Sequence, residues 1–156
     1  MRILLAVDGS RFSDAAVNEV SSRPWPAGSE VKIVSAFQVP LSATPEVWAL
    51  PDQYYETLER TVKEHAQAVV DAAVATVKGR LYNSVGITGE ILAGPPREAI
   101  LDEANRWKAD LIILGSHGYG AWQRFLLGSV SQAVVSHATC SVEVVHIRPD
   151  EKAKAA

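Results

Sequence analysis

Five short runs rich in branched apolar residues recur along the chain, and segments with helical patterns separate them. The first run, from Ile3 to Val7, is uniformly apolar, which is typical of a strand buried on both faces of a parallel sheet. The predicted strands are Arg2–Val7, Glu30–Phe37, Gly86–Ala93, Asp110–Leu114 and Ser141–Ile147. Their alternation with helices predicts one α/β domain in which helices cover both faces of a parallel sheet.

The segments between these strands carry helix signals. Ser13 is the predicted N-cap of the first helix, because its hydroxyl can accept from free N–H groups at a helix start. The longest helical pattern covers Asp52–Lys78, and Gly79 occupies the expected C-cap position. Segment 38–51 holds three prolines and is predicted to be a loop. Further helices are expected to start at Gly94-Pro95-Pro96 and to span about Ser129–His137.

Composition excludes several classes of protein. A length of 156 residues suggests one domain, assigned to 1–148, followed by a flexible tail over 149–156. The single cysteine, Cys140, excludes a disulfide framework and is expected to pack as a small hydrophobe. The net charge of −3 argues against a nucleic-acid partner. The longest apolar run is too short for a membrane span or a signal-peptide core, so a cytoplasmic protein with no membrane partner is expected.

In a sheet of this type, ligands bind beyond the carboxyl ends of the strands, where the strand order reverses. The loops after Val7, Phe37, Ala93 and Leu114 are therefore the candidates for a binding site.

A glycine-rich stretch follows the fourth predicted strand and holds four of the ten glycines. It runs from Gly115 to a predicted helix start at Ser129. Glycines let a ligand approach the backbone closely, and a helix start presents free N–H groups to an anion. The stretch therefore indicates a phosphate site, although glycines that only make tight turns would give the same pattern. Neither a Walker-A loop nor a dinucleotide fingerprint is present.

The spacing G-x2-G-x9-G-[ST], matched by Gly115, Gly118, Gly128 and Ser129, resembles the ATP-binding motif of the universal stress protein family. Two further blocks agree: Val7-Asp8-Gly9-Ser10 after the first strand, and Gly128-Ser129-Val130-Ser131 followed by residues 138–145. The resemblance covers 1–148. Ser141 departs from it, because the family usually has proline there.

The resemblance implies a five-stranded sheet of order 3-2-1-4-5, like that of the adenine-nucleotide alpha-hydrolases, holding ATP (or ADP or AMP) with Mg²⁺. It implies an adenine wall with nearby backbone groups, ribose contacts, and phosphate contacts from the glycine loop and the following helix start. The nucleotide-binding residues so assigned are Ala6, Val7, Asp8, Ala36, Leu114, Gly115, Gly118, Gly128, Ser129, Val130 and Ser131.

Three side chains have alternative roles at this stage. Asp8 would accept from a ribose hydroxyl or reach phosphate-bound Mg²⁺ through water, or it caps a turn. Arg124 and His117 could contact a phosphate, or they face solvent. No histidine has metal-ligand spacing with another histidine or with the cysteine, so no metal is assigned to side chains directly.

The predicted fifth strand, Ser141–Ile147, is apolar on both faces. An edge strand of this kind needs cover, and the resemblance suggests pairing with a second copy in a two-fold dimer. The function expected first is a nucleotide-dependent stress-response regulator without catalytic residues. A slow ATP hydrolase or phosphotransfer protein at the same site is the first alternative. A module for another small ligand or a protein, in which the glycine loop is only structural, is the second.

Overall fold

The computed structural model describes residues 1–39, 52–81, 85–118 and 127–147. Most of the predicted loop over 38–51 and the predicted tail over 149–156 lie outside this part of the chain. The elements are, in order, β1 (Arg2–Ala6), α1 (Arg11–Ser22), β2 (Glu30–Phe37), α2 (Asp52–Arg80), β3 (Gly86–Ala93), α3 (Pro96–Trp107), β4 (Leu111–Gly115), α4 (Ser129–His137) and β5 (Ser141–Val145).

The five strands form one sheet of order β3-β2-β1-β4-β5, with every neighbouring pair parallel. This confirms the predicted fold class and strand order. β1 and β4 are direct neighbours, although more than a hundred residues separate them, and Ile3 pairs with Leu111. Because the chain leaves β1 toward one edge and returns at β4 toward the other, the strand order reverses between them.

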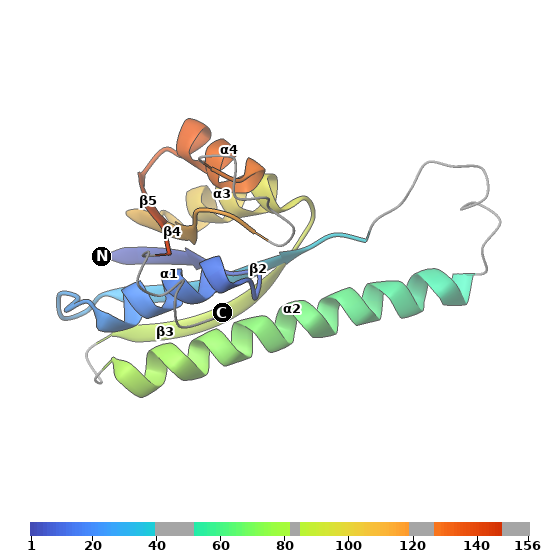
Figure 1. Cartoon of the computed structure of the whole chain (residues 1–156), viewed down its shortest axis with the longest axis horizontal. Helices are drawn as coiled ribbons and strands as arrows, with labels where there is room; N and C mark the ends of the chain where they lie inside the picture. The colour runs from blue at the N-terminus through green and yellow to red at the C-terminus, as the bar shows by residue number, and fades with distance from the viewer. Residues whose placement is uncertain (40–51, 82–84, 119–126, 148–156) are drawn as a thin grey trace.

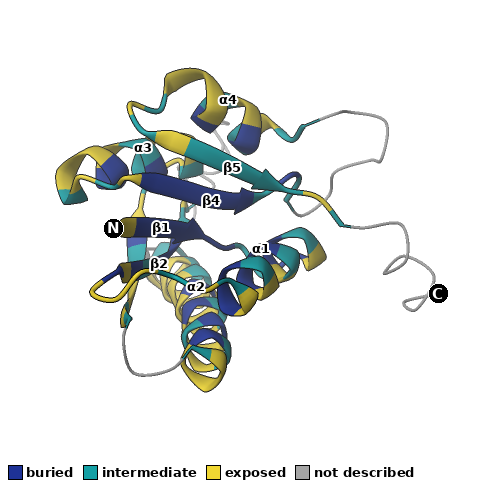
Figure 2. Cartoon of the chain, turned by 90° about the vertical axis from the view of Figure 1, so that its left-hand side faces the viewer, coloured by how far each residue is buried: buried dark blue, intermediate teal, exposed yellow. Residues whose placement is uncertain are grey.

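Helices cover both faces of the sheet, as Figure 1 shows with α1 and α2 on one side and α3 and α4 on the other. Alternate residues of a strand point to opposite faces. Ile3 and Leu5 of β1 accordingly pack with α1 and α2, whereas Leu4 packs with α3 and α4. In Figure 2 the central strands β1 and β4 are mostly buried, while β5 at the edge is largely of intermediate exposure.

Several predicted boundaries were wrong by a few residues. Helix α1 begins at Arg11, so Ser10 is its N-cap rather than Ser13, and the Ser10 hydroxyl accepts from the Ser13 N–H. Gly79 lies inside α2, which continues to Arg80 because the helical hydrogen bonds extend past the glycine. The observed ends of three strands also differ from the predicted ends. β1 ends at Ala6, β4 covers Leu111–Gly115, and β5 ends at Val145, where its pairing with β4 ends.

Among the helices described, none combines the length and the apolarity that crossing a bilayer demands.

Candidate functional site

A pocket of about 750 Å³ lies beyond the carboxyl ends of β1, β2 and β4, at the starts of α3 and α4. This is the reversal point at which the sequence predicted a ligand. All eleven residues predicted to bind nucleotide line the pocket, and so does His117. Arg124, the other predicted phosphate contact, lies outside the described residues.

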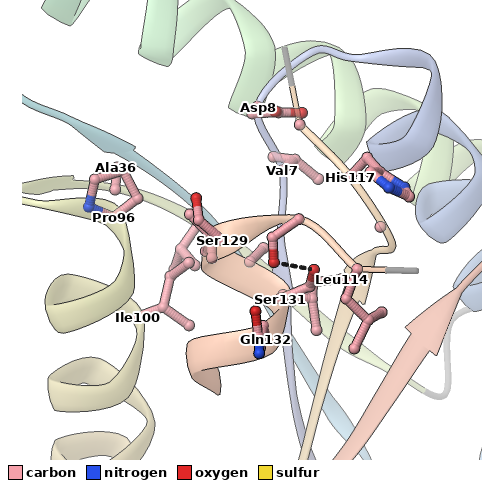
Figure 3. A pocket seen from close by; sticks show the side chains of 17 residues that line it. Val7, Asp8, Ala36, Pro96, Ile100, Leu114, His117, Ser129, Ser131 and Gln132 are labelled. Carbon is pink, nitrogen blue, oxygen red and sulfur yellow. Dashed lines mark hydrogen bonds between the residues drawn. The ribbon is translucent and has the colours of Figure 1, made fainter. Parts of the chain in front are cut away.

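Two walls of different character face each other across the pocket in Figure 3. Ala36, Pro96 and Ile100 lie on one side, and Asp8 and His117 lie on the other. The apolar side suits a flat aromatic group, because such groups bind by burial against aliphatic side chains.

Five lining residues were missed by the sequence analysis: Val34, Pro96, Ile100, Leu127 and Gln132. Pro96 and Ile100 belong to α3, whose start was expected close to the site because it follows a strand end. The sequence analysis did not indicate that the first turns of α3 would line the pocket.

The first turn of α4 presents backbone N–H donors at the pocket. Its N-cap is Gly128, which has no side chain to cap the helix, and the first helical N–H with a backbone acceptor is that of Gln132. Within the described residues, the backbone N–H groups of Ser129, Val130 and Ser131 donate to no acceptor. These three donors, together with the positive end of the helix dipole, make a site for an anion.

The start of α1 differs from that of α4, although both follow central strands. The Ser10 hydroxyl accepts from the Ser13 N–H at 3.3 Å, and the Asp8 carboxylate accepts from the Ser10 N–H at 3.0 Å. Side chains therefore already occupy donors at the start of α1. The hydrogen bond from the Ser10 N–H shows that Asp8 stabilises the turn, and the same side chain also lines the pocket.

Ser131 is one of the residues predicted to bind nucleotide, but its hydroxyl donates to the protein backbone. Its Oγ donates to the Ser116 carbonyl at 2.9 Å and to the Gly128 carbonyl at 3.0 Å, the second contact being dashed in Figure 3. A serine hydroxyl has one hydrogen, and here internal acceptors take it. The backbone N–H is therefore the donor of Ser131 that remains for a phosphate.

The glycines of the loop are needed for different reasons. A Cβ on Gly115 would lie 2.6 Å from the backbone carbonyl carbon and oxygen of Phe12, so Gly115 permits α1 to pack against β4. A Cβ on Gly118 would instead meet the Asp8 carboxylate. Gly128 sits more loosely, with the nearest contact at 3.2 Å from the His117 Cα. The alternative in which these glycines serve only tight packing therefore describes Gly115 well but not Gly118.

The Asp8 carboxylate places one negative charge at one side of the pocket. Asp8 is its only carboxylate among the described lining residues, and none of those residues is a lysine or an arginine. Burial raises the pKa of the nearby Asp14 carboxyl, and the charge of Asp8 raises it further. An anionic group is therefore expected to bind beside α4, where backbone N–H groups supply the positive potential.

Comparison with known proteins agrees with this geometry. The sequence pattern of the universal stress protein family matches residues 1–146. A universal stress protein of Thermus aquaticus is 34% identical over 146 residues, covering 92% of this chain and 96% of the relative. The structure of UspA from Lactobacillus plantarum has a TM-score of 0.75 at 26% identity, covering 93% of this chain and 97% of its own. A universal stress protein family member from Arabidopsis thaliana, solved with AMP bound, has a TM-score of 0.66 at 20% identity over 97% and 94% of the two chains.

Proposed function

The chain belongs to the universal stress protein family, and from that premise we propose that its pocket binds an adenine nucleotide and that the bound state regulates a stress response. The observation that carries this proposal is the start of α4, where three N–H groups without an acceptor in the described residues face a pocket with an apolar opposite wall. Phosphate fits the first feature and a purine ring fits the second.

In the proposed pose, Ala6, Val7 and Ala36 contact the adenine, and Asp8 accepts a hydrogen bond from the ribose. The phosphates lie along Gly118 and the N–H groups of residues 129–131. The AMP bound by the Arabidopsis relative supports this ligand class, because the two folds superimpose over nearly the whole chain.

Magnesium would enter with the phosphates. Within the described residues, no group of three or more histidine, cysteine or acidic side chains could hold a metal ion. Mg²⁺ keeps several waters and is usually bound through one or two carboxylates and substrate phosphates. The Asp8 carboxylate, the single carboxylate among the described lining residues, fits that donor set, so we propose that Mg²⁺ binds the nucleotide and reaches Asp8 through water.

Regulation is favoured over rapid turnover because the described lining residues include no lysine or arginine to stabilise charge on a transferring phosphoryl group. A slow ATP hydrolase at the same site remains the competing function. One measurement distinguishes the regulator from the hydrolase: the rate of ADP release from ATP at saturating Mg²⁺.

The first experiment is to denature the purified protein and identify released small molecules by mass spectrometry. Isothermal titration with AMP, ADP and ATP, each with and without Mg²⁺, then measures affinity. We expect saturable binding of at least one adenine nucleotide. Absence of binding by all three in a folded protein would refute the proposal and favour the module for a different ligand.

We further propose that β5 pairs with a second copy in a two-fold dimer and that the protein acts in the cytoplasm. β5 is an edge strand, hydrogen-bonded on one side to β4, and its apolar residues are only half buried. Light scattering at micromolar concentration should give twice the chain mass. The Val145 carbonyl faces β4, where it accepts from the Ser116 N–H, so the backbone N–H of the preceding Val144 faces the free edge. Val144→Pro removes that N–H and should shift the mass toward the monomer if the free edge makes the contact.

A further inference from the structure

Ser116 and Ser131 form a buried connection between the end of β4 and the first turn of α4. Both residues are almost completely buried. The Ser116 carbonyl accepts two hydrogen bonds, from the Gly128 N–H at 2.8 Å and from the Ser131 Oγ at 2.9 Å. The Ser116 N–H donates to the Val145 carbonyl of β5, so the accepting group is itself held by the sheet.

We infer that Ser131 is a positioning residue for the phosphate site, an inference that rests on the proposed nucleotide binding. Its hydroxyl does not touch the ligand. It ties the third residue of α4 to the strand end, and thereby aims the N–H groups of residues 129–131 into the pocket.

A comparison within the molecule supports this role. At the start of α1, Ser13 occupies the same third position and donates to the carbonyl of the N-cap residue Ser10 at 2.9 Å. That helix has a second restraint, because the Ser10 side chain accepts from the Ser13 N–H. Helix α4 has glycine at its N-cap and lacks that second restraint. The hydroxyl of Ser131 therefore orients a helix start whose N–H groups are left for a ligand.

Loss of the Ser131 hydroxyl should weaken phosphate binding selectively. Loss of this hydroxyl loosens the donors to phosphate but leaves the apolar wall and Asp8 in place. Affinity for AMP should therefore fall while affinity for adenosine, which lacks phosphate, stays nearly constant. A residue that only stabilises the fold would change both affinities together or neither.

The test is isothermal titration of the full chain with AMP and with adenosine, for the wild type, Ser131→Ala and Ser131→Thr. We expect Ser131→Ala to reduce the preference for AMP over adenosine about fivefold, the effect of losing one hydrogen bond. Ser131→Thr keeps the hydroxyl and should restore most of the preference.

Ser21→Ala is the matched control. Ser21 is also buried, and its hydroxyl donates to a helix carbonyl, that of Val17, at 2.6 Å near the far end of α1. This variant should lose stability without a change in the ratio of the two affinities. If Ser131→Ala does not fold, Ser131→Cys, with its weaker donor, should still lower the ratio at least about twofold.

The outcomes separate the inference from the proposed function. If the wild type binds none of AMP, ADP and ATP, the proposed function fails, and this inference fails with it. If only ADP or ATP binds, that nucleotide takes the place of AMP in the comparison with adenosine. If the wild type binds AMP but folded Ser131 variants keep the wild-type ratio, or lose both affinities equally, the inference alone is overturned.

Discussion

The carboxylate of Asp8 lies over Gly118, so that a Cβ at position 118 would be only 2.7 Å from Asp8 Oδ2. Asp8 follows β1 and Gly118 follows β4, which makes this contact a junction between the two central strand ends. The other carboxylate oxygen of Asp8 accepts from the Ser10 N–H at 3.0 Å. A side chain at 118 would therefore displace a carboxylate that the turn into α1 holds in place.

Substitution of Gly118 should reduce nucleotide binding. Gly118→Ala is expected to weaken AMP affinity about tenfold, a cost of roughly 1–2 kcal/mol, because Asp8 must leave its hydrogen bond to Ser10. Gly118→Val should weaken it further. Isothermal titration measures both changes, and circular dichroism establishes that each variant is folded.

Gly79→Ala is the control for these variants. Gly79 lies in α2, and a Cβ there would meet nothing within 4 Å. The change should raise the free energy of unfolding by about 0.5–1 kcal/mol through helix propensity and leave AMP affinity unchanged. Wild-type affinity in folded Gly118→Val would show that position 118 does not border the ligand.

Gly115→Ala should act on stability. The added methyl group would lie 2.6 Å from the Phe12 backbone, which belongs to α1 and has little room to move. We expect the free energy of unfolding to fall by about 1–3 kcal/mol in urea titrations, the usual cost of overpacking. A stability equal to wild type would mean that α1 and β4 can separate without cost.

Glu103→Gln should destabilise the protein more than Glu90→Gln. Glu103 of α3 is 4% exposed, and its carboxylate contacts Lys32 at 2.9 Å and Arg106, whereas Glu90, which contacts the same two cations, is 41% exposed. We expect a loss of about 2–3 kcal/mol for Glu103→Gln and below about 1 kcal/mol for Glu90→Gln. Equal losses in urea unfolding would contradict this ranking.

The ion pair between Lys32 and Glu103 predicts that the stability of the protein changes at alkaline pH. Burial lowers the pKa of Lys32, but hydrogen bonds to Glu103 and Glu90 raise it by more, so its pKa lies above the ordinary value. The stabilisation is therefore complete below about pH 10.4, the ordinary pKa of lysine, and is lost as the pH rises through the higher folded-state pKa. The stability gap between wild type and Glu103→Gln should narrow over that range. A stability difference that grows as the pH rises would contradict a raised pKa of Lys32.

Cys140 should react slowly with thiol reagents. Burial raises the pKa of its thiol, which packs among the residues between α3, α4 and β5, and Asp110 adds to the rise. At pH 8 we expect alkylation about tenfold slower than that of a free cysteine, because only the thiolate reacts. Full reactivity should return in urea, and a native rate equal to that in urea would place the thiol in open solvent.

Much of the site could be predicted because its signals are local. Gly128 and Ser129 mark a helix start without a side-chain cap, and Asp8 directly follows a strand that is uniformly apolar. Pro96 and Ile100 were missed for the opposite reason. Their place in the pocket depends on how α3 packs against α4, β2 and β3, and no residue of α3 alone sets that packing.

The sequence by itself determined the class of fold, the identity of the strands and the position of the turn that we propose binds phosphate, because apolar periodicity and glycine spacing are properties of neighbouring residues. Only the tertiary structure decided how Ser131 and Gly115 are used. A hydroxyl donates to whichever acceptor lies within reach, and for Ser131 one acceptor is fifteen residues away, on Ser116. A glycine leaves room for the close approach of another segment, and for Gly115 that segment is the Phe12 backbone of α1.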